Sequence, residues 1–400
     1  MKLFAYRYRP VHAISEKLLA LTAALVPTGV KDQPVGECPR KVLVLKFGGM
    51  GEAVLARSLV ERLRERNPSM SFDFLVEKRT VEMMTCGSQG RVFMYSPGAD
   101  GMGKALATLR EIRSRRYDAV LDFEQRSLLT AAFARATSIP VRVGFVPPDP
   151  SPRGRMFTHP IDLHENDSMW SAFIRIGRVL DPSLPDSLTT LPLPCSAESE
   201  AWFSEWRRSR IGPEVDGPVV AMHIGVGPSA QYRCWPTERF ADLATTLVGF
   251  QRDLTIILTG AKSEKALIID FRRRFAGRSL DASDLGGLEH TAALLRRCDL
   301  LISNDTGIMH LGAAMGTPTV GLFGASNPVW WAPVGPRATY VYPTRQPCSP
   351  CINSYLRHIP EKCMAAHESA CMWDITIDDV LNAARTVVRS PWPAKLSARR

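Results

Sequence analysis

Apolar runs and amphipathic segments alternate along residues 41–145 and again along residues 219–323. Runs such as Val42–Leu45 are apolar at every position, which is typical of strands that are buried on both faces of a parallel sheet. The segments between them carry apolar residues three and four positions apart, which is typical of helices with one buried face. This alternation predicts an α/β fold with two Rossmann-like, doubly wound domains.

The spacing of these patterns predicts individual elements and a domain boundary. In the first half we expect strands at 42–45, 72–76, 119–123 and 141–145, and helices at 52–66, 104–115, 128–137 and 164–180. In the second half we expect strands at 219–224, 255–259, 300–302 and 319–323, and helices at 237–250, 263–274 and 290–297. Residues 147–160 are expected to form a proline-rich loop, and residues 181–218 are rich in proline around a short helix at 202–207. We therefore expect an N-terminal segment and linker at 1–40, domains at 41–200 and 201–385, and a basic tail at 386–400.

The stretch ISNDTGIMHLGAAMGTPTVGLFG, residues 302–324, predicts a strand, a tight turn, a helix and a second strand. Asn304 and Asp305 are turn and N-cap residue types, and Gly316 is a typical helix stop. A helix that begins at the carboxyl end of a strand binds anions, because its free N–H groups and its dipole point to the same place. This predicts a phosphate at the helix start, residues Thr306, Gly307 and Ile308, although an ordinary capped helix is an alternative.

The chain has 400 residues and a formal net charge of +10, with 45% hydrophobic and 22% charged residues. The length suits two or three domains with sizeable cores. The positive charge favours anionic substrates or an anionic membrane surface. Nucleic acid is not expected, because the basic clusters at 62–66, 113–116 and 272–274 lie on helical patterns without a nucleic-acid-binding module around them.

No apolar run is long enough to predict a transmembrane helix. The longest one near the N-terminus, LLALTAALV at 18–26, follows several basic residues, as in a secretory signal, but lacks a convincing cleavage site of small residues. We interpret residues 10–27 as an amphipathic helix that lies on a membrane surface or packs on the protein. The predicted location is the cytoplasm, at the inner face of the cytoplasmic membrane.

Four of the nine cysteines are concentrated near the C-terminus. They are Cys348, Cys351, Cys363 and Cys371. Four thiolates can hold a structural zinc ion, although these spacings do not match a standard zinc ribbon. Free thiols and disulfides are the alternatives, and a reducing cytoplasm disfavours the disulfides.

Four stretches, in this order, resemble glycosyltransferase family nine, the lipopolysaccharide heptosyltransferase family. They are KVLVLKFGGMGEAVLARSLVERLR, YDAVLDFEQRSLLTAAF, GPSAQYRCWPTERFADLA and SNDTGIMHLGAAMGTPTVGLFGASNP. The resemblance covers about residues 41 to 385. It implies the GT-B architecture, in which two Rossmann-like domains face a central cleft, with the acceptor on the first domain and a nucleotide-sugar donor on the second.

The resemblance implies that Glu52 is the catalytic base. The family has an aspartate at this position, so the carboxyl group here extends one methylene further. From its place in the first turn of a helix we expect a lowered pKa, and a purely structural carboxylate is the alternative. Lys46, Gly49 and Gly51 are expected to contact the acceptor or a phosphate, or Lys46 pairs with Glu52. The FGGMGE turn does not fit the dinucleotide fingerprint.

The resemblance also places the donor on the second domain. Arg233 is expected to bind the donor phosphate, with Ser229 as a further donor of a hydrogen bond, because an arginine fork suits an anion. Glu264 is expected to bind the ribose. The remaining residues predicted around the donor are Gly287 and Leu288 beside the nucleobase, and Asp305 and His310 near the sugar or phosphate. A solvated loop arginine, a surface glutamate, a helix cap at Asp305 and a buried structural histidine are the alternatives.

Together these features predict an inverting, metal-independent glycosyltransferase. The expected donor is a nucleotide sugar such as ADP-heptose, and the expected acceptor is the lipopolysaccharide core or a related glycolipid. No cofactor is expected for catalysis, and the only metal considered is the structural zinc. A non-catalytic protein that binds sugar nucleotides is one alternative, kept open by the glutamate at position 52. A hydrolase or epimerase of the same architecture is the other.

Overall fold

The computed structural model describes most of the chain and divides it into two compact units, one ending at Leu188 and one beginning at Thr189. The described residues are 39–95, 101–149, 151–210, 217–227, 231–283, 285–343, 345–353, 355, 359–360, 362–365 and 367–388. The predicted helix at 10–27, residue Ser229 and most of the predicted basic tail lie outside these ranges. Among the described helices, none is both long enough and apolar enough to cross a membrane.

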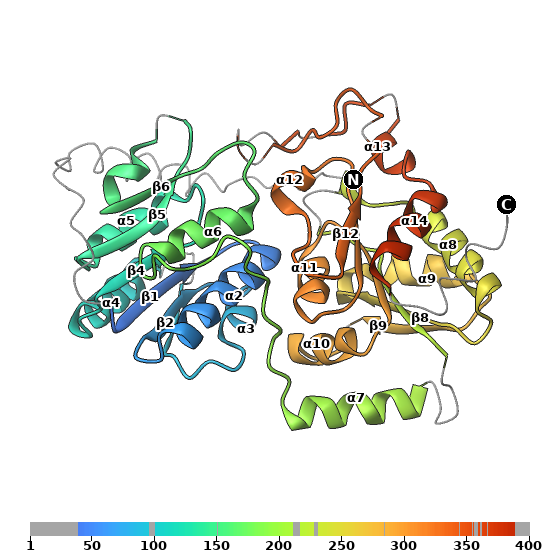
Figure 1. Cartoon of the computed structure of the whole chain (residues 1–400), viewed down its shortest axis with the longest axis horizontal. Coiled ribbons are helices and arrows are strands. Elements are labelled where there is room, and N and C mark those ends of the chain that lie inside the picture. The colour runs from blue at the N-terminus through green and yellow to red at the C-terminus, as the bar shows by residue number, and fades with distance from the viewer. Residues whose placement is uncertain are drawn as a thin grey trace. The chain divides into compact units, whose positions relative to one another are not determined.

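The first unit is built on a six-stranded parallel sheet in the order β3-β2-β1-β4-β5-β6 (Figure 1). Its strands are β1 (Lys41–Lys46), β2 (Ser71–Val76), β3 (Val92–Met94), β4 (Ala119–Asp122), β5 (Val141–Val146) and β6 (His159–Asp162). Its helices are α2 (Met50–Arg66), α3 (Val81–Thr85), α4 (Gly101–Ser114), α5 (Leu128–Ala136), the 3-10 turn η1 (Pro152–Met156) and α6 (Met169–Arg178). The strand order reverses between β1 and β4. In doubly wound sheets the ligand crevice opens at the carboxyl ends of the strands at such a point.

The second unit repeats this arrangement with the parallel order β12-β11-β10-β7-β8-β9. Its strands are β7 (Val219–His223), β8 (Thr255–Gly260), β9 (Ser279–Ser283), β10 (Leu300–Asn304), β11 (Thr319–Leu322) and β12 (Ala338–Val341). Its helices are α7 (Ala197–Arg210), η2 (Gln231–Arg233), α8 (Thr237–Phe250), η3 (Lys262–Glu264), α9 (Lys265–Arg274), α10 (Leu288–Arg296), α11 (Gly307–Ala314), α12 (Pro328–Trp331), α13 (Ala370–Trp373) and α14 (Ile377–Val387). Here the order reverses between β7 and β10, so the second crevice is expected between these two strands.

The two doubly wound α/β units confirm the predicted fold class, and the differences lie in elements with weak patterns. Strand β6 is short and alternates half-buried and exposed residues, and its first two residues lie in the stretch expected to be loop. Helix α6 begins at Met169 instead of residue 164, because Ser168 caps it by accepting a hydrogen bond from Ser171 N. Strands β3, β9 and β12 were not predicted, since short edge strands carry little apolar signal.

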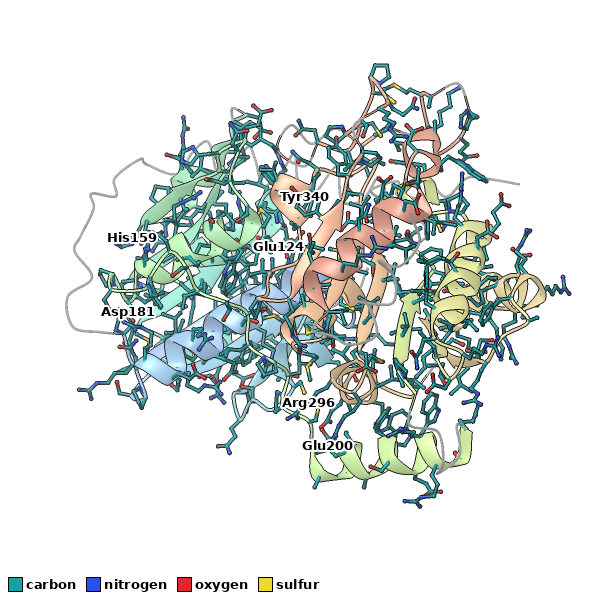
Figure 2. All side chains as sticks on the ribbon, turned by 45° about the vertical axis from the view of Figure 1, so that its right-hand side comes forward. Glu124, His159, Asp181, Glu200, Arg296 and Tyr340 are labelled. Carbon is teal, nitrogen blue, oxygen red and sulfur yellow. The ribbon has the colours of Figure 1, made fainter. Side chains whose placement is uncertain are left out.

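Helix α7 belongs to the second unit. Its Trp202 ring stacks on the His290 ring with centroids 4.0 Å apart. Glu200 pairs with Arg296 and Arg297 on and just after α10, at 3.3 and 2.9 Å (Figure 2). The expected domain boundary at residue 200 therefore falls inside a helix that packs on the second sheet unit.

Helix α11 packs closely on its sheet, and its first residues lie just beyond the carboxyl end of β10. A side chain on Gly312 would collide with Leu301 of β10 and lie 3.3 Å from Thr319 of β11. The helix ends as the sequence predicted, with Gly316 directly beyond it at φ 80°, a backbone conformation that favours glycine. The close approach depends on a small residue in the middle of the helix.

Candidate active site

Lys46 ends strand β1 with its side chain completely buried, and two carboxylates surround its ammonium group. Its Nζ lies 2.8 Å from Glu52 Oε2 and also pairs with Glu124 Oε1. The lysine was expected either to hold a ligand or to pair with Glu52. Because it is fully enclosed and engaged by both carboxylates, pairing is the role that the structure supports.

Glu124 is held rigidly from several sides. Its Oε1 accepts hydrogen bonds from the backbone N–H groups of Phe47 and Gly48, at 2.9 and 3.0 Å. Its own N–H donates to Asp122 Oδ1 at 2.9 Å, and its carbonyl accepts from Arg153. Arg153 is in turn paired with Asp122 at 2.8 Å, with both side chains completely buried. The loop that follows β4 is therefore fixed against the turn that follows β1.

The glycine turn allows the Glu52 carboxylate to fold back over its own helix start. Gly49 is the N-cap residue of α2 and adopts φ 67°. A Cβ atom on Gly49 would lie 2.8 Å from Glu52 Cδ, closer than such atoms approach. Gly51 lies in the first turn of α2. The turn thus needs a glycine at position 49 both for its backbone and for the room that it leaves beside Glu52.

The three charged groups have different proton affinities. Burial raises the pKa of Glu52. The positive charge of Lys46 acts to lower this pKa and the negative charge of Glu124 acts to raise it, and the net shift is upward. Burial also acts to raise the pKa of Glu124, but Lys46 and the backbone donors outweigh it, so the net pKa is lowered. Burial acts to lower the pKa of Lys46, and the two carboxylates raise it overall. The expectation of a lowered pKa at Glu52 was wrong, because removal from water exceeds the effect of the helix start.

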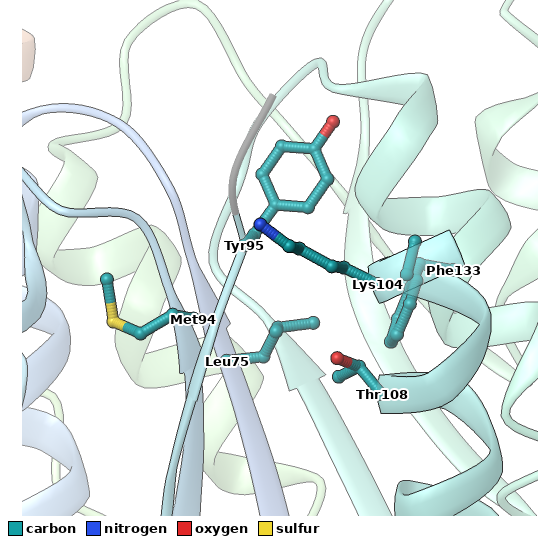
Figure 3. A pocket seen from close by; sticks show the side chains of 7 residues that line it. Leu75, Met94, Tyr95, Lys104, Thr108 and Phe133 are labelled. Carbon is teal, nitrogen blue, oxygen red and sulfur yellow. The ribbon is translucent and has the colours of Figure 1, made fainter. Parts of the chain in front are cut away.

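A small pocket lies next to this turn in the first unit (Figure 3). Its rim includes Tyr95, whose ring stacks on Phe47 of the turn with centroids 4.7 Å apart. The residues that line it are Leu75, Met94, Tyr95, Lys104, Ala105, Thr108 and Phe133. The hollow is therefore mostly apolar, with one cationic and two hydroxyl side chains.

In the second unit, Arg233 and Asp305 meet at the crevice between β7 and β10. Arg233 Nη1 lies 3.2 Å from Asp305 Oδ2, and the arginine side chain keeps 24% of its exposure. Thr306, not Asp305, is the N-cap residue of α11, and it makes no capping hydrogen bond through its side chain. The cap, one of the two roles expected for Asp305, was therefore wrong, because Thr306 occupies the cap position and the Asp305 carboxylate pairs with the arginine. The helix start at Gly307 and Ile308 has no side-chain cap from Thr306 and can accept an anion.

Asn304, which was expected only as a turn or cap residue, joins the parts of this crevice. Its Oδ1 accepts from Trp235 N at 2.9 Å, and its Nδ2 donates to Ile224 O at 3.0 Å. The side chain is completely buried at the end of β10. It therefore ties the Arg233 loop and the end of β7 to the strand that precedes Asp305.

Glu264 and His310 also lie at this crevice. The Glu264 carboxylate accepts from Ala261 N at 2.7 Å and lies against Gly225 after β7, where a Cβ atom would collide with it. His310 is 3% exposed, and its Nδ1 has no hydrogen-bond partner within the described part of the chain. Burial lowers the pKa of His310 to about 4, although Asp305 acts in the opposite direction. An unpartnered buried nitrogen next to Asp305 is consistent with a ligand contact and does not fit a satisfied core histidine.

The other predicted residues have less direct support. Gly287 is the N-cap residue of α10 and Leu288 begins that helix, so both are placed at a helix start after β9. Cys351 and Cys371 are buried in the core of the second unit, and Cys363 packs against it. Among the described residues, no group of three His, Cys, Asp or Glu side chains is arranged to hold a metal ion. The zinc site thus stays a prediction.

Comparisons with known proteins agree with this geometry. Residues 196–358 match the sequence model of glycosyltransferase family 9 (heptosyltransferase). The match covers most of the second unit of the chain. It is 24% identical over 319 residues to "Lipopolysaccharide heptosyltransferase 2" of Salmonella typhimurium, covering 75% of this chain and 87% of the relative. The family match and these relatives together identify a glycosyltransferase of the heptosyltransferase-like type.

Solved structures show the same fold. A glycosyltransferase family 9 protein from Veillonella parvula superimposes with a TM-score of 0.70 at 20% identity, covering 89% of this chain and 99% of the other. The E. coli "ADP-heptose lps heptosyltransferase II" superimposes with a TM-score of 0.66 at 18% identity, covering 87% and 98%. In this glycosyltransferase, the two groups of polar residues lie at the reversal points of the two sheets, where the fold places ligands.

Sequence reasoning missed Glu124 and Asn304, although both lay in motifs that it had singled out. Each follows or ends a strand whose neighbour could not be read from the sequence. Strand β4 lies beside β1, and β10 lies beside β7. The carboxyl ends of parallel strands meet at one edge of the sheet, so the order of the strands makes polar residues at the ends of these central strands candidates for the site.

Proposed function

We propose that this glycosyltransferase moves heptose from ADP-heptose to a lipopolysaccharide-core sugar or a related glycolipid, with inversion at the anomeric carbon. The similarity to lipopolysaccharide heptosyltransferases, one of which is named for ADP-heptose, supports the choice of substrates. The observation that carries the chemistry is the Lys46–Glu52 pair, in which a partly exposed carboxylate with a raised pKa contacts the buried lysine that ends the first central strand.

In this mechanism Glu52 accepts the proton of the acceptor hydroxyl. The hydroxyl oxygen then forms a bond to the anomeric carbon as the bond from that carbon to the diphosphate oxygen breaks. The leaving ADP keeps the electron pair of the broken bond. A general base works best when its pKa lies near the working pH, and the raised pKa of Glu52 moves it in that direction.

The second unit is proposed to stabilise the departing diphosphate. Arg233 can donate charge-assisted hydrogen bonds, and the start of α11 offers free N–H groups at Gly307 and Ile308. Glu264 is proposed to accept hydrogen bonds from the ribose, and His310 to contact the sugar or phosphate. Because protein groups supply the positive charge, we propose that transfer requires no divalent metal.

We also propose that the reaction takes place at the cytoplasmic face of the inner membrane. The excess of positive charge, +10 over the chain, suits both an anionic donor and an anionic membrane surface. A glycolipid acceptor would be presented at that surface.

A direct assay tests the proposed function. The purified protein is incubated with ADP-heptose and a heptose-deficient lipopolysaccharide core, with and without a chelator, and the product is analysed by mass spectrometry. We expect one added heptose per acceptor and unchanged turnover in the chelator. Release of free heptose without an acceptor product would favour a hydrolase. Binding of ADP without either product would favour a non-catalytic protein.

A further inference from the structure

One ammonium group shares its surroundings with two carboxylates at the end of β1. Glu52 comes from helix α2 and Glu124 from the loop after β4, and both contact Lys46 Nζ. The lysine side chain has no exposed surface, so its charge has to be balanced within the protein. One carboxylate balances that charge, so the three groups together carry an excess negative charge when both carboxylates are ionised.

The two carboxylates are held in different ways. Glu124 receives the N–H groups of Phe47 and Gly48 in addition to Lys46, which favours its ionised form. Its backbone is fixed by Asp122 and by the buried Arg153. Glu52 retains 21% exposure of its side chain, against 15% for Glu124, and lies over the glycine turn.

We propose that Glu124 is a positioning residue that engages the charge of Lys46, so that Glu52 is only partly neutralised and keeps a high affinity for a proton. This rests on the proposed function of Glu52 as the base. The two carboxylates thus have different roles. Glu124 neutralises the lysine and holds the turn in place, and Glu52 exchanges the proton. The raised pKa of Glu52 and the lowered pKa of Glu124 agree with this division.

Other charged groups near the turn do not replace Glu124. Arg79 donates from Nε to Phe47 O at 3.0 Å, and the same nitrogen lies 3.0 Å from Glu77 Oε2. The positive charge of Arg79 is therefore already opposed by Glu77, and its side chain is 52% exposed. The charged groups that act on Glu52 are Lys46 and Glu124, and the neutral Gln125 side chain also interacts with it.

The test compares Glu124→Gln with the wild type. Glutamine keeps an oxygen that can accept from Phe47 and Gly48 but removes the negative charge, so Lys46 is left with Glu52 alone. We expect the pKa of Glu52 to fall by about one unit or more, the usual effect of a lost like charge beside a remaining opposite charge. The acidic limb of the pH profile of kcat/KM should move down by the same amount, with an unchanged KM for the donor.

A matched control is Glu65→Gln, which makes the same chemical change near the other end of α2, where the side chain is 55% exposed. It should leave the acidic limb in place. Carbon-detected NMR titration of the side-chain carboxyls gives a readout that is independent of transfer. In the wild type, Glu124 should titrate below Glu52, a measurement that needs no variant to fold.

Three results would overturn the inference. They are a Glu124 that titrates above Glu52, a Glu52 pKa that is unchanged in Glu124→Gln, or a pH profile that does not move although the variant is folded. If the titrations behave as expected but the wild type transfers no sugar, the positioning role stands and the proposed function fails. The two conclusions can therefore be separated.

Discussion

Replacing Arg233 by alanine should weaken the binding of ADP far more than the binding of adenosine. The arginine side chain lies 3.2 Å from Asp305 and beside the uncapped start of α11, where the diphosphate is proposed to bind. A hydrogen bond to a charged group contributes about 1.5–3 kcal/mol, which corresponds to a loss of roughly 10- to 150-fold in affinity. Adenosine has no phosphate at this position and should lose little.

The Arg233–Asp305 pair adds a second contribution to the same experiment. Without the arginine, the Asp305 carboxylate is unpaired, at 7% side-chain exposure, and repels the diphosphate. Two unit charges about 4 Å apart repel by about 1 kcal/mol even in water. The double variant Arg233→Ala with Asp305→Asn should therefore bind ADP about 1 kcal/mol more tightly than Arg233→Ala alone.

Isothermal titration calorimetry with ADP and adenosine on each variant measures these differences. Arg272→Ala is a suitable control, because Arg272 is an exposed arginine on α9 and its removal changes the net charge equally. Equal losses for ADP and adenosine would mean that Arg233 supports the loop and does not hold the phosphate. A double variant no better than Arg233→Ala would refute the role given to Asp305.

Three further predictions concern other residues. Glu52→Gln should lose about 10²–10⁴ in turnover with little change in ADP affinity, and near-normal turnover in a steady-state assay would contradict its role as base. His310 has a pKa of about 4 in the fold, below the ordinary value of 6.5, so its contribution to stability is full above about pH 6.5 and is lost as the pH falls towards 4. The free energy of urea unfolding of the wild type, measured relative to His310→Leu, should thus fall by about 2 kcal/mol between pH 7 and pH 4.5, and parallel pH dependences would contradict this. If the cysteines at 348–371 bind zinc, elemental analysis should find about one zinc per chain and a chelator should loosen the region after residue 345, whereas metal-free and fully stable protein would exclude the site.

Much of the fold could be predicted from local patterns. The apolar runs of the central strands and the spacing of the long helices are properties of neighbouring residues, and Gly316 ended its helix as its residue type suggested. The short edge strand β6 and the capped start of α6 were misjudged, since their signals are spread over only a few half-exposed positions.

The candidate site was only partly predictable, because it depends on which strands are neighbours. Lys46 and Glu52 are close in sequence, so their pairing could be foreseen as an alternative. Glu124 lies 78 residues from Lys46 and reaches it only because β4 pairs with β1. The pKa of Glu52 likewise depends on burial, which a helix-start argument does not include.

The sequence by itself determined the α/β class, the two Rossmann-like units and the residue types at the strand ends, because these follow from local periodicity and backbone preference. Only the tertiary structure decided what those residues contact. It paired Arg233 with Asp305 across 72 positions, moved the helix cap to Thr306 and enclosed Lys46 between two carboxylates. Charges and hydrogen bonds act over a few ångströms in space, and distance in space is set by the order of the strands rather than by distance along the chain.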